Sequence, residues 1–335
     1  MKEKLNILVT GGTGYIGSHT CVSLLKSGHN VVIIDNLSNS KRDVVDKIEH
    51  ISGRKVPFFE LDVIEEHLVA AVFDQYTFDG VIHFAGYKAV SESVEKPLAY
   101  YFNNLVSTMV LSKLCKKHNV HKFVFSSSAT VYGDNEVPFT ESMDLLKTTN
   151  PYGETKAMCE RILTDYAHSN PDSSVTLLRY FNPVGAHSSG LIGELPNGRP
   201  NNLMPFVTQV AKGIRPELSV YGDDYDTVDG TGVRDYIHVV DLAEGHVAAI
   251  ENMTEGVKIY NLGTGQGTSV LELVEAFKSV NSIDVPYKIV SRRPGDIASC
   301  YASVDKAKKE LNWTAQKTIE DMCRDSWHFE KNIGE

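Results

Sequence analysis

The chain has 335 residues, of which 42% are hydrophobic and 23% are charged, and its formal net charge is −10 at pH 7. These proportions are typical of a globular protein with an ample core in one or two domains. No basic run offsets the negative charge, which argues against nucleic acids and acidic membranes as general partners. An anionic ligand would therefore need a few placed arginines and backbone amides.

The beginning of the chain, MKEKLNILVTGG, runs into a strand pattern without an apolar h-region, so we expect no signal peptide. No stretch approaches the roughly 18 apolar residues of a membrane span. The five cysteines are odd in number, scattered and free of any CxxC pair, which predicts reduced thiols and a cytoplasmic location. No HExxH motif is present, and we expect no metal.

Short apolar runs alternate with longer helical patterns along the first half of the chain. The apolar runs predict strands at residues 6–11, 31–35, 56–62, 80–86, 122–128 and 175–182. Helical segments separate them, including 15–28, a long one after Pro97 and another after Pro151. This alternation predicts an α/β fold with a Rossmann-type, doubly wound parallel sheet covered on both faces.

The pattern changes near residue 183, where loops rich in Gly, Asn and Pro surround a helical segment at 202–213. Short strands are predicted at 218–222 and 258–263. We therefore expect a nucleotide-binding domain at 1–182 and a smaller mixed α/β substrate lobe at 183–335, with some crossing of the chain between them.

A glycine-rich stretch, VTGGTGYIGSH, follows the first strand and opens a helix. It can be read as Gly12-x-Gly14-x-x-Gly17 or as Gly11-x-x-Gly14-x-x-Gly17. The early glycines permit a tight turn close to a pyrophosphate, and the last one lets the helix lie against the sheet. Such turns also serve as plain connectors, but the strand–turn–helix context favours a dinucleotide site.

Asp35 ends the second strand, close to 20 residues after the glycines, where a carboxylate can accept hydrogen bonds from ribose hydroxyls. Asn36 and Leu37 follow, and Lys41 and Arg42 come later, so no arginine directly follows to neutralise a 2′-phosphate. The pattern favours NAD over NADP. A solvated strand end is the alternative for Asp35.

Tyr152 and Lys156 are four residues apart on a predicted helix and so share one face. The fifth strand ends in serines, and Ser128 can reach the same region. A free tyrosine, with a pKa of about 10, is a poor base, but a neighbouring ammonium and a nicotinamide ring favour phenolate. We therefore expect the pKa of Tyr152 to fall, so that it takes a proton from a substrate hydroxyl. A surface lysine beside a half-buried tyrosine is the alternative.

Extended segments carry a resemblance to a known family. They are GGTGYIGSHT (11–20), DNLSNSKR (35–42), HFAGYKAVSESV (83–94), SSSATVYGD (126–134), PYGETK (151–156), LRYFNPVGAH (178–187), PNNLMP (200–205), GTGVRDYIHVVDLA (230–243) and ELNW (310–313). Over nearly its whole length the chain resembles the extended short-chain dehydrogenase/reductase family and, within it, the UDP-glucose 4-epimerases.

The resemblance implies an isomerase that interconverts UDP-galactose and UDP-glucose with no net redox change. Tightly bound NAD would take hydride from C4 and return it after the 4-keto sugar turns over, while Tyr152, Lys156 and Ser128 act in catalysis. Relatives are homodimers that associate through two helices of the nucleotide domain. The segments at about 97–118 and 151–168 are the candidates.

The resemblance also implies the binding residues. For the cofactor they are Gly11, Gly14, Tyr15, Ile16, Gly17, Asp35, Asn36, Asn39, Ser40, Asp62, Val63, Phe84, Ala85, Lys88, Asn103, Ser128, Tyr152, Lys156, Tyr180 and Phe181. For the UDP-sugar they are Ser128, Tyr152, Asn182, Asn202, Leu203, Val220, Tyr221, Arg234, Arg293 and Cys300. Arginine forks suit a diphosphate, although surface salt bridges are the alternative for Arg234 and Arg293, and core positions for Tyr180 and Tyr221.

Cys300 stands where similar epimerases carry either a bulky or a small residue beside the sugar. We expect it to leave room for an N-acetyl group, so that UDP-N-acetylglucosamine and UDP-N-acetylgalactosamine also interconvert. A small buried apolar residue is the alternative.

Ala129 and Thr130 stand where the related dehydratases carry an acidic pair, which argues against that reaction. A UDP-glucuronate 4-epimerase and a catalytically silent NAD-binding regulator remain as rivals.

Overall fold

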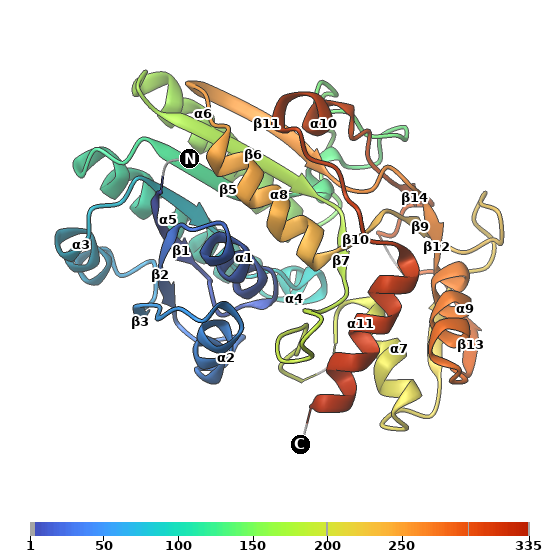
Figure 1. The fold of residues 1–335 in the computed structure, drawn as a ribbon. Helices are drawn as coiled ribbons and strands as arrows, with labels where there is room; N and C mark the ends of the chain where they lie inside the picture. Colours follow the sequence, from blue (N-terminus) through green and yellow to red (C-terminus); the bar gives the residue numbers. More distant parts are fainter. Residues whose placement is uncertain (1–3, 199, 294, 334–335) are drawn as a thin grey trace.

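A computed structural model describes residues 4–198, 200–293 and 295–333. A seven-stranded parallel sheet forms its centre, in the order β11-β6-β5-β4-β1-β2-β3 (Figure 1). The strands are β1 (Asn6–Thr10), β2 (Asn30–Asp35), β3 (Phe58–Glu60), β4 (Gly80–His83), β5 (Lys122–Ser128), β6 (Ser174–Tyr180) and β11 (Gly256–Leu262). The predicted α/β fold with a doubly wound sheet is confirmed. Since the strand order reverses at the β1–β4 pair, the carboxyl ends of these strands border the crevice where such sheets bind ligands.

The seventh strand differs from the prediction, which placed residues 258–263 in the substrate lobe. β11 lies instead beside β6 in the central sheet, with Leu262 paired to Tyr180. The sheet is therefore completed by chain from beyond residue 182, and membership of the sheet does not follow the expected boundary.

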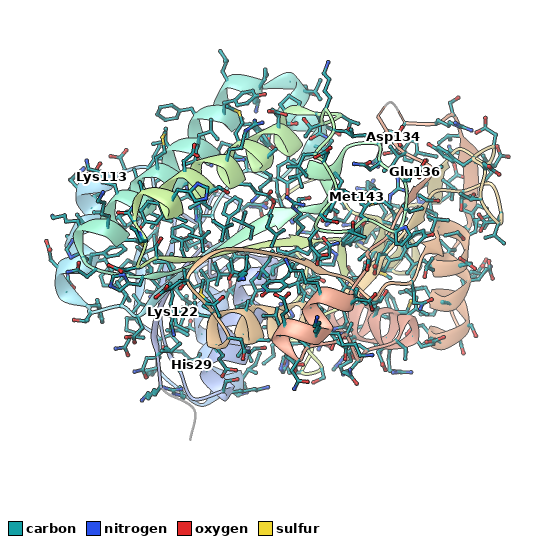
Figure 2. The ribbon with its side chains drawn as sticks, turned by 90° about the horizontal axis from the view of Figure 1, so that it is seen from above. His29, Lys113, Lys122, Asp134, Glu136 and Met143 are labelled. Atoms are coloured by element: carbon teal, nitrogen blue, oxygen red, sulfur yellow. The ribbon has the colours of Figure 1, made fainter. Side chains whose placement is uncertain are left out.

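Helices cover both faces of the sheet, as Figure 1 shows. One face carries α1 (Tyr15–Lys26), α2 (Asp43–Ser52) and α8 (Val239–Glu251). The other carries α3 (Glu66–Gln75), α4 (Val90–Glu95), α5 (Pro97–Lys117) and α6 (Pro151–Ser169). Figure 2 shows this layering through His29, which follows α1, and Lys113 on α5, which lie on opposite sides of the sheet.

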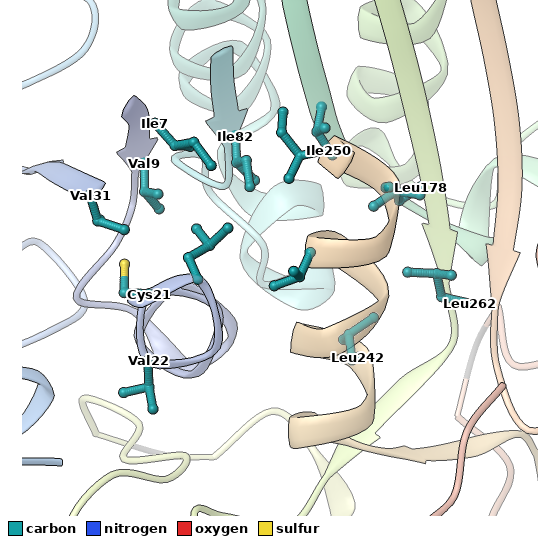
Figure 3. Packing of buried hydrophobic residues seen from close by; sticks show 14 of the residues in the cluster. Ile7, Val9, Cys21, Val22, Val31, Ile82, Leu178, Leu242, Ile250 and Leu262 are labelled. Atoms are coloured by element: carbon teal, nitrogen blue, oxygen red, sulfur yellow. The ribbon is translucent and has the colours of Figure 1, made fainter. Parts of the chain in front are cut away.

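The contact between α1 and α8 joins early and late parts of the chain. Cys21 of α1 and Leu242 and Ile250 of α8 belong to one buried apolar cluster with Val9 and Leu178 of the sheet (Figure 3). Burial of apolar surface is the main driving force of folding. The shared cluster therefore fastens α8 to the nucleotide-binding part of the molecule.

The remaining chain forms a smaller mixed lobe. Its helices are α7 (Leu203–Ala211), α9 (Val270–Asn281), α10 (Asp305–Leu311) and α11 (Ile319–Asn332). Its strands pair as β7 (Asn182–Val184) with β10 (Tyr236–His238), β8 (Leu218–Tyr221) with β13 (Tyr287–Val290), and β9 (Val233–Arg234) between β12 (Thr268–Ser269) and β14 (Ser299–Cys300). A short 3-10 helix, η1 (Ala129–Tyr132), follows β5.

Candidate functional site

A cavity of about 600 Å³ opens at the carboxyl ends of the sheet strands, a size typical of cofactor sites. The predicted cofactor residues that line it are Gly11, Gly14, Tyr15, Ile16, Gly17, Asp35, Asn36, Asn39, Ser40, Asp62, Val63, Phe84, Ala85, Lys88, Asn103, Tyr152, Lys156 and Tyr180. Among the described residues, two predicted cofactor contacts lie outside this lining. Ser128 is hydrogen-bonded to the side chain of Tyr152, which lines the cavity, and the buried Phe181 packs against Phe139.

The glycine-rich turn has the geometry of a phosphate cradle. Gly11 has a φ of +71°, which side-chain-bearing residues rarely adopt. A Cβ on Gly17 would lie 2.2 Å from the carbonyl oxygen of Gly11, so this position admits no side chain without movement of the backbone. Gly14 caps α1 without a side-chain hydrogen bond to its first amides. The free amides and the positive dipole end of α1 are therefore available to bind an anion beside the turn.

Asp35 supports this turn from the end of β2. Its carboxylate accepts hydrogen bonds from the backbone N–H groups of Thr13 (3.1 Å) and Leu37 (2.9 Å) and from the hydroxyl of Ser40 (3.2 Å). The side chain is buried at the edge of the cavity. This placement joins the glycine turn to the end of β2, where the prediction puts the adenosine ribose.

Tyr152 and Lys156 enter the cavity from the first turns of α6. Asn150 caps this helix by accepting a hydrogen bond from the N–H of Gly153 (2.9 Å), and Pro151 occupies its first position. Tyr152 is hydrogen-bonded to Ser128, and the ammonium of Lys156 lies 6.0 Å from the centre of the Tyr152 ring. The structure thus brings the three predicted catalytic side chains together.

Burial dominates the electrostatics of the reacting group. Burial raises the pKa of Tyr152, and only the hydrogen bond with Ser128 acts in the opposite direction. Burial lowers the pKa of Lys156 to about 8, while its ammonium donates to the backbone carbonyl of Ser126 (2.6 Å). In the protein alone, the desolvation of the phenol therefore outweighs the hydrogen bond with Ser128. The predicted fall in the pKa of Tyr152 refers to the complex with the positive nicotinamide ring and stays a prediction.

Two segments of the cavity wall were not anticipated. They are the loop at 190–197 and the end of α11 with the residue after it, including Phe329, Asn332 and Ile333. Within the loop, the carboxylate of Glu194 accepts from the amide of Asn202 (2.6 Å) and lies 3.4 Å from the ammonium of Lys88. No local motif marks these residues, because tertiary packing alone brings them to the cavity.

The predicted substrate residues from the lobe lie outside the lining of this cavity, as far as the described chain extends. Cys300 is paired with Arg234 across β14 and β9, so these two are neighbours. The guanidinium of Arg293 lies 5.6 Å from the centre of the Tyr221 ring and pairs with Asp296. Val220 is 2% exposed and belongs to the core of the lobe, so its side chain does not line an open site for the UDP-sugar.

The described residues contain no cluster of three or more His, Cys, Asp or Glu side chains arranged to hold a metal ion. In the same part of the chain, no helix combines the length and the apolar character needed to cross a membrane.

Comparisons with known proteins agree with this geometry. The model of the NAD dependent epimerase/dehydratase family matches residues 7–263. The chain is 56% identical to the UDP-glucose 4-epimerases of Pasteurella multocida and of Bacillus subtilis, with 97% of each chain covered. It also resembles the crystal structure of the Bifidobacterium longum UDP-glucose 4-epimerase in complex with NAD+ and UDP, with a TM-score of 0.95, 54% identity and 98% of each chain covered. The chain belongs to the NAD dependent epimerase/dehydratase family.

Proposed function

We propose that this protein interconverts UDP-galactose and UDP-glucose by inverting C4 of the hexose through a 4-keto intermediate. The observation that carries the proposal is the grouping of Tyr152 and Lys156, which line the cavity, with Ser128, which is hydrogen-bonded to Tyr152. The relatives reported above, named as UDP-glucose 4-epimerases, match over nearly the whole chain.

The cavity fits NAD. Gly11 and Gly17 let the turn pack closely against the backbone of Ala85 and against itself, and α1 begins at this turn beside the cavity, where its free amides suit a pyrophosphate. Asp35 stands at the ribose end, and Lys156 and Tyr180 at the nicotinamide end. Bound NAD would supply the hydride chemistry, as acceptor from C4 of the sugar and donor to the opposite face, and would be regenerated in each turnover.

Tyr152 is the group that moves the proton. Its phenolic oxygen takes the proton of the 4-hydroxyl and returns it when the new alcohol forms. The hydrogen bond with Ser128 orients that oxygen. The ammonium of Lys156, 6.0 Å from the centre of the ring, is the nearby positive charge that would favour the phenolate during the reaction. Since burial raises the pKa of Tyr152 in the protein alone, the positive charges that approach it in the complex must provide the remaining lowering.

Purified protein given UDP-galactose without added NAD tests the proposal. We expect UDP-glucose, detected through a coupled dehydrogenase, because the cofactor remains bound. A silent NAD-binding regulator would give no product. A preference for UDP-glucuronate in a parallel assay would favour the hexuronate epimerase instead.

We further propose that N-acetylated UDP-hexosamines are also substrates. Cys300 lies beside Arg234 in β14, and burial raises the pKa of its thiol to about 12, so it is a small uncharged side chain. We expect Cys300→Tyr to remove turnover of UDP-N-acetylgalactosamine and to spare that of UDP-galactose. If neither protein turns over the acetylated sugar, this extension is wrong.

We propose a homodimer that associates through α5. Leu98, Phe102 and Met109 of this helix are 81%, 60% and 47% exposed, which is unusual for large apolar side chains at such spacing. Light scattering should give about twice the chain mass of 37.1 kDa, and Phe102→Glu should give the monomer. All five cysteines are free, and we propose the cytoplasm as the site of action.

A further inference from the structure

A buried charge pair lies on α6 and β6, directly behind the reacting group. The carboxylate of Glu160 accepts hydrogen bonds from Nε (2.9 Å) and Nη2 (2.6 Å) of Arg179 and from the hydroxyl of Ser127 (2.5 Å). The side chains of Glu160 and Arg179 are 5% and 3% exposed. These three residues, which we call the Glu160 cluster, have no role in the proton transfer proposed above.

Each member of the Glu160 cluster adjoins a proposed catalytic residue or a residue of the cavity lining. Glu160 follows Lys156 by one helical turn on the same face of α6. Ser127 directly precedes Ser128, and Arg179 directly precedes Tyr180. Ser127 and Arg179 are paired across β5 and β6. The hydrogen bonds of Glu160 therefore fix the position of α6 relative to the carboxyl ends of β5 and β6, which face the cavity.

Stability alone is a weak reason for this arrangement. Two buried charges lose their hydration, and an apolar pair of equal volume is often no less stable. One nitrogen of the guanidinium, Nη1, makes no hydrogen bond of standard geometry. The Tyr132 side chain compensates in part, since its ring centre lies 4.7 Å from the guanidinium carbon and its hydroxyl interacts with Arg179. The desolvation of the Glu160–Arg179 pair is an unfavourable free energy that is not fully compensated. Because Glu160 lies one helical turn from Lys156, this points to a functional reason for the pair.

We propose that the Glu160 cluster is a positioning device for catalysis, which holds Tyr152 and Lys156 in register with Ser128 and balances the charge behind Lys156. This inference rests on the proposed epimerase function and names residues that act through the catalytic group without contacting the sugar.

The charge balance can be traced through the groups that surround Lys156. His83 on β4 and Cys159 and Glu160 on α6 act on Lys156. Tyr100 on α5 and Tyr180 on β6 act on Tyr152, and Arg179 on β6 pairs with Glu160. His83 is neutral because burial lowers its pKa to about 3. Burial lowers the pKa of Lys156, and Cys159 and the carboxylate of Glu160 oppose that effect. Removal of this carboxylate would leave the buried Arg179 without its ion-pair partner.

The pH profile of kcat/KM for UDP-galactose tests the proposal. In Glu160→Gln, both protons of the Tyr152–Lys156 pair should leave more readily, because the lost anion favoured the protonated forms. We expect the profile to move to lower pH by about one unit or more. In the double variant Glu160→Gln/Arg179→Met, which removes both charges, the profile should return toward that of the wild type at a lower kcat.

A matched control is available in the lobe. Glu330 is likewise a buried carboxylate that accepts from a hydroxyl, that of Thr208 (3.0 Å), and lies 3.5 Å from a cation, Lys212. Glu330→Gln removes a comparable buried charge without touching α6. Its pH profile should coincide with that of the wild type.

A second readout does not depend on turnover. The ultraviolet absorbance of tyrosinate, taken as the difference between each protein and its Tyr152→Phe version, should show ionisation of Tyr152 at lower pH in Glu160→Gln than in the wild type. If Glu160→Gln does not fold, Ser127→Ala serves instead. This neutral change loosens the carboxylate and should lower kcat severalfold at an unchanged KM for UDP-galactose.

The inference would be overturned if folded Glu160→Gln showed the same pH profile of kcat/KM and the same tyrosinate titration as the wild type. Equal shifts of the pH profile in Glu330→Gln would overturn it as well. For Ser127→Ala, an unchanged kcat would do the same. These results presuppose an active wild type. A wild-type protein that leaves UDP-galactose unconverted would refute the proposed function instead, so the two failures are distinguishable.

Discussion

The cofactor cavity and the C-terminal lobe hold their functional residues in different ways. At the cavity, strand ends and one glycine turn bring the predicted residues to a common edge, so the backbone itself determines their positions. In the lobe, most of the predicted substrate residues lie on short strands and loops, Leu203 begins α7, and side-chain contacts such as that of Arg293 with Tyr221 hold individual residues in place. The cavity is therefore prepared by the fold, whereas the lobe depends on individual side chains.

The largest effect is expected at Tyr152, in the wall of the cavity. Tyr152→Phe keeps the ring but removes the oxygen proposed to move the proton, so kcat should fall by about 10³-fold or more. The NAD content should stay unchanged, because the glycine turn is intact. Turnover and bound NAD, measured on the same preparation, check this. A variant with full activity and full NAD content would eliminate the proposed mechanism.

A methyl group at Gly17 should disable the cavity alone. In Gly17→Ala the Cβ would meet the carbonyl oxygen of Gly11, and the forced shift of the backbone should cost about 1–3 kcal/mol and release the cofactor. Gly28→Ala is the control for backbone strain, because Gly28 has a positive φ, which Gly17 does not, and has no atom within 4 Å of the added Cβ. Loss of NAD from both proteins to the same extent would argue against a specific cradle.

Loss of the guanidinium at Arg234 should impair the lobe alone. In Arg234→Met, kcat/KM for UDP-galactose should fall by about 10- to 100-fold, the size of a lost charge-assisted hydrogen bond. The NAD content should match that of the wild type. Arg292→Gln controls for charge, because Arg292 pairs with Asp224 at the surface. Equal losses in both variants would refute a specific role for Arg234.

The last prediction concerns the free energy of unfolding at acidic pH, to which the buried His83 of the central sheet contributes. His83 bonds Thr10 (2.7 Å), and burial lowers its pKa to about 3 from 6.5. Below pH 6.5 the unfolded chain binds a proton that the folded protein excludes, so stability falls as the pH decreases. At pH 5 this amounts to about 2 kcal/mol.

Denaturant unfolding of the wild type and of His83→Gln at pH 7 and pH 5 measures this loss. The variant should be less stable at pH 7 but should lose less stability on acidification. An equal pH dependence in both proteins would assign the acid sensitivity to other groups.

The same contrast explains how far the sequence could be interpreted. Six strands and the helices after Pro97 and Pro151 were predictable, because alternating apolar runs and prolines act locally. The membership of β11 was not, since a short apolar strand carries no mark of the sheet that it joins. Glu194 and the end of α11 reach the cavity only through packing. The pKa of Tyr152 depends on burial, which local pattern does not reveal.

The position of β11 has a consequence for the way this chain can be divided. A fragment that stops at residue 182 would leave the hydrogen-bonding edge of β6 uncovered and would strip α8 from the apolar cluster around α1. Exposed edges of this kind invite pairing with other molecules. The two halves of the chain, divided at residue 182, therefore cannot be exchanged between relatives as independent units. A chimera must carry residues 239–262 together with the first half.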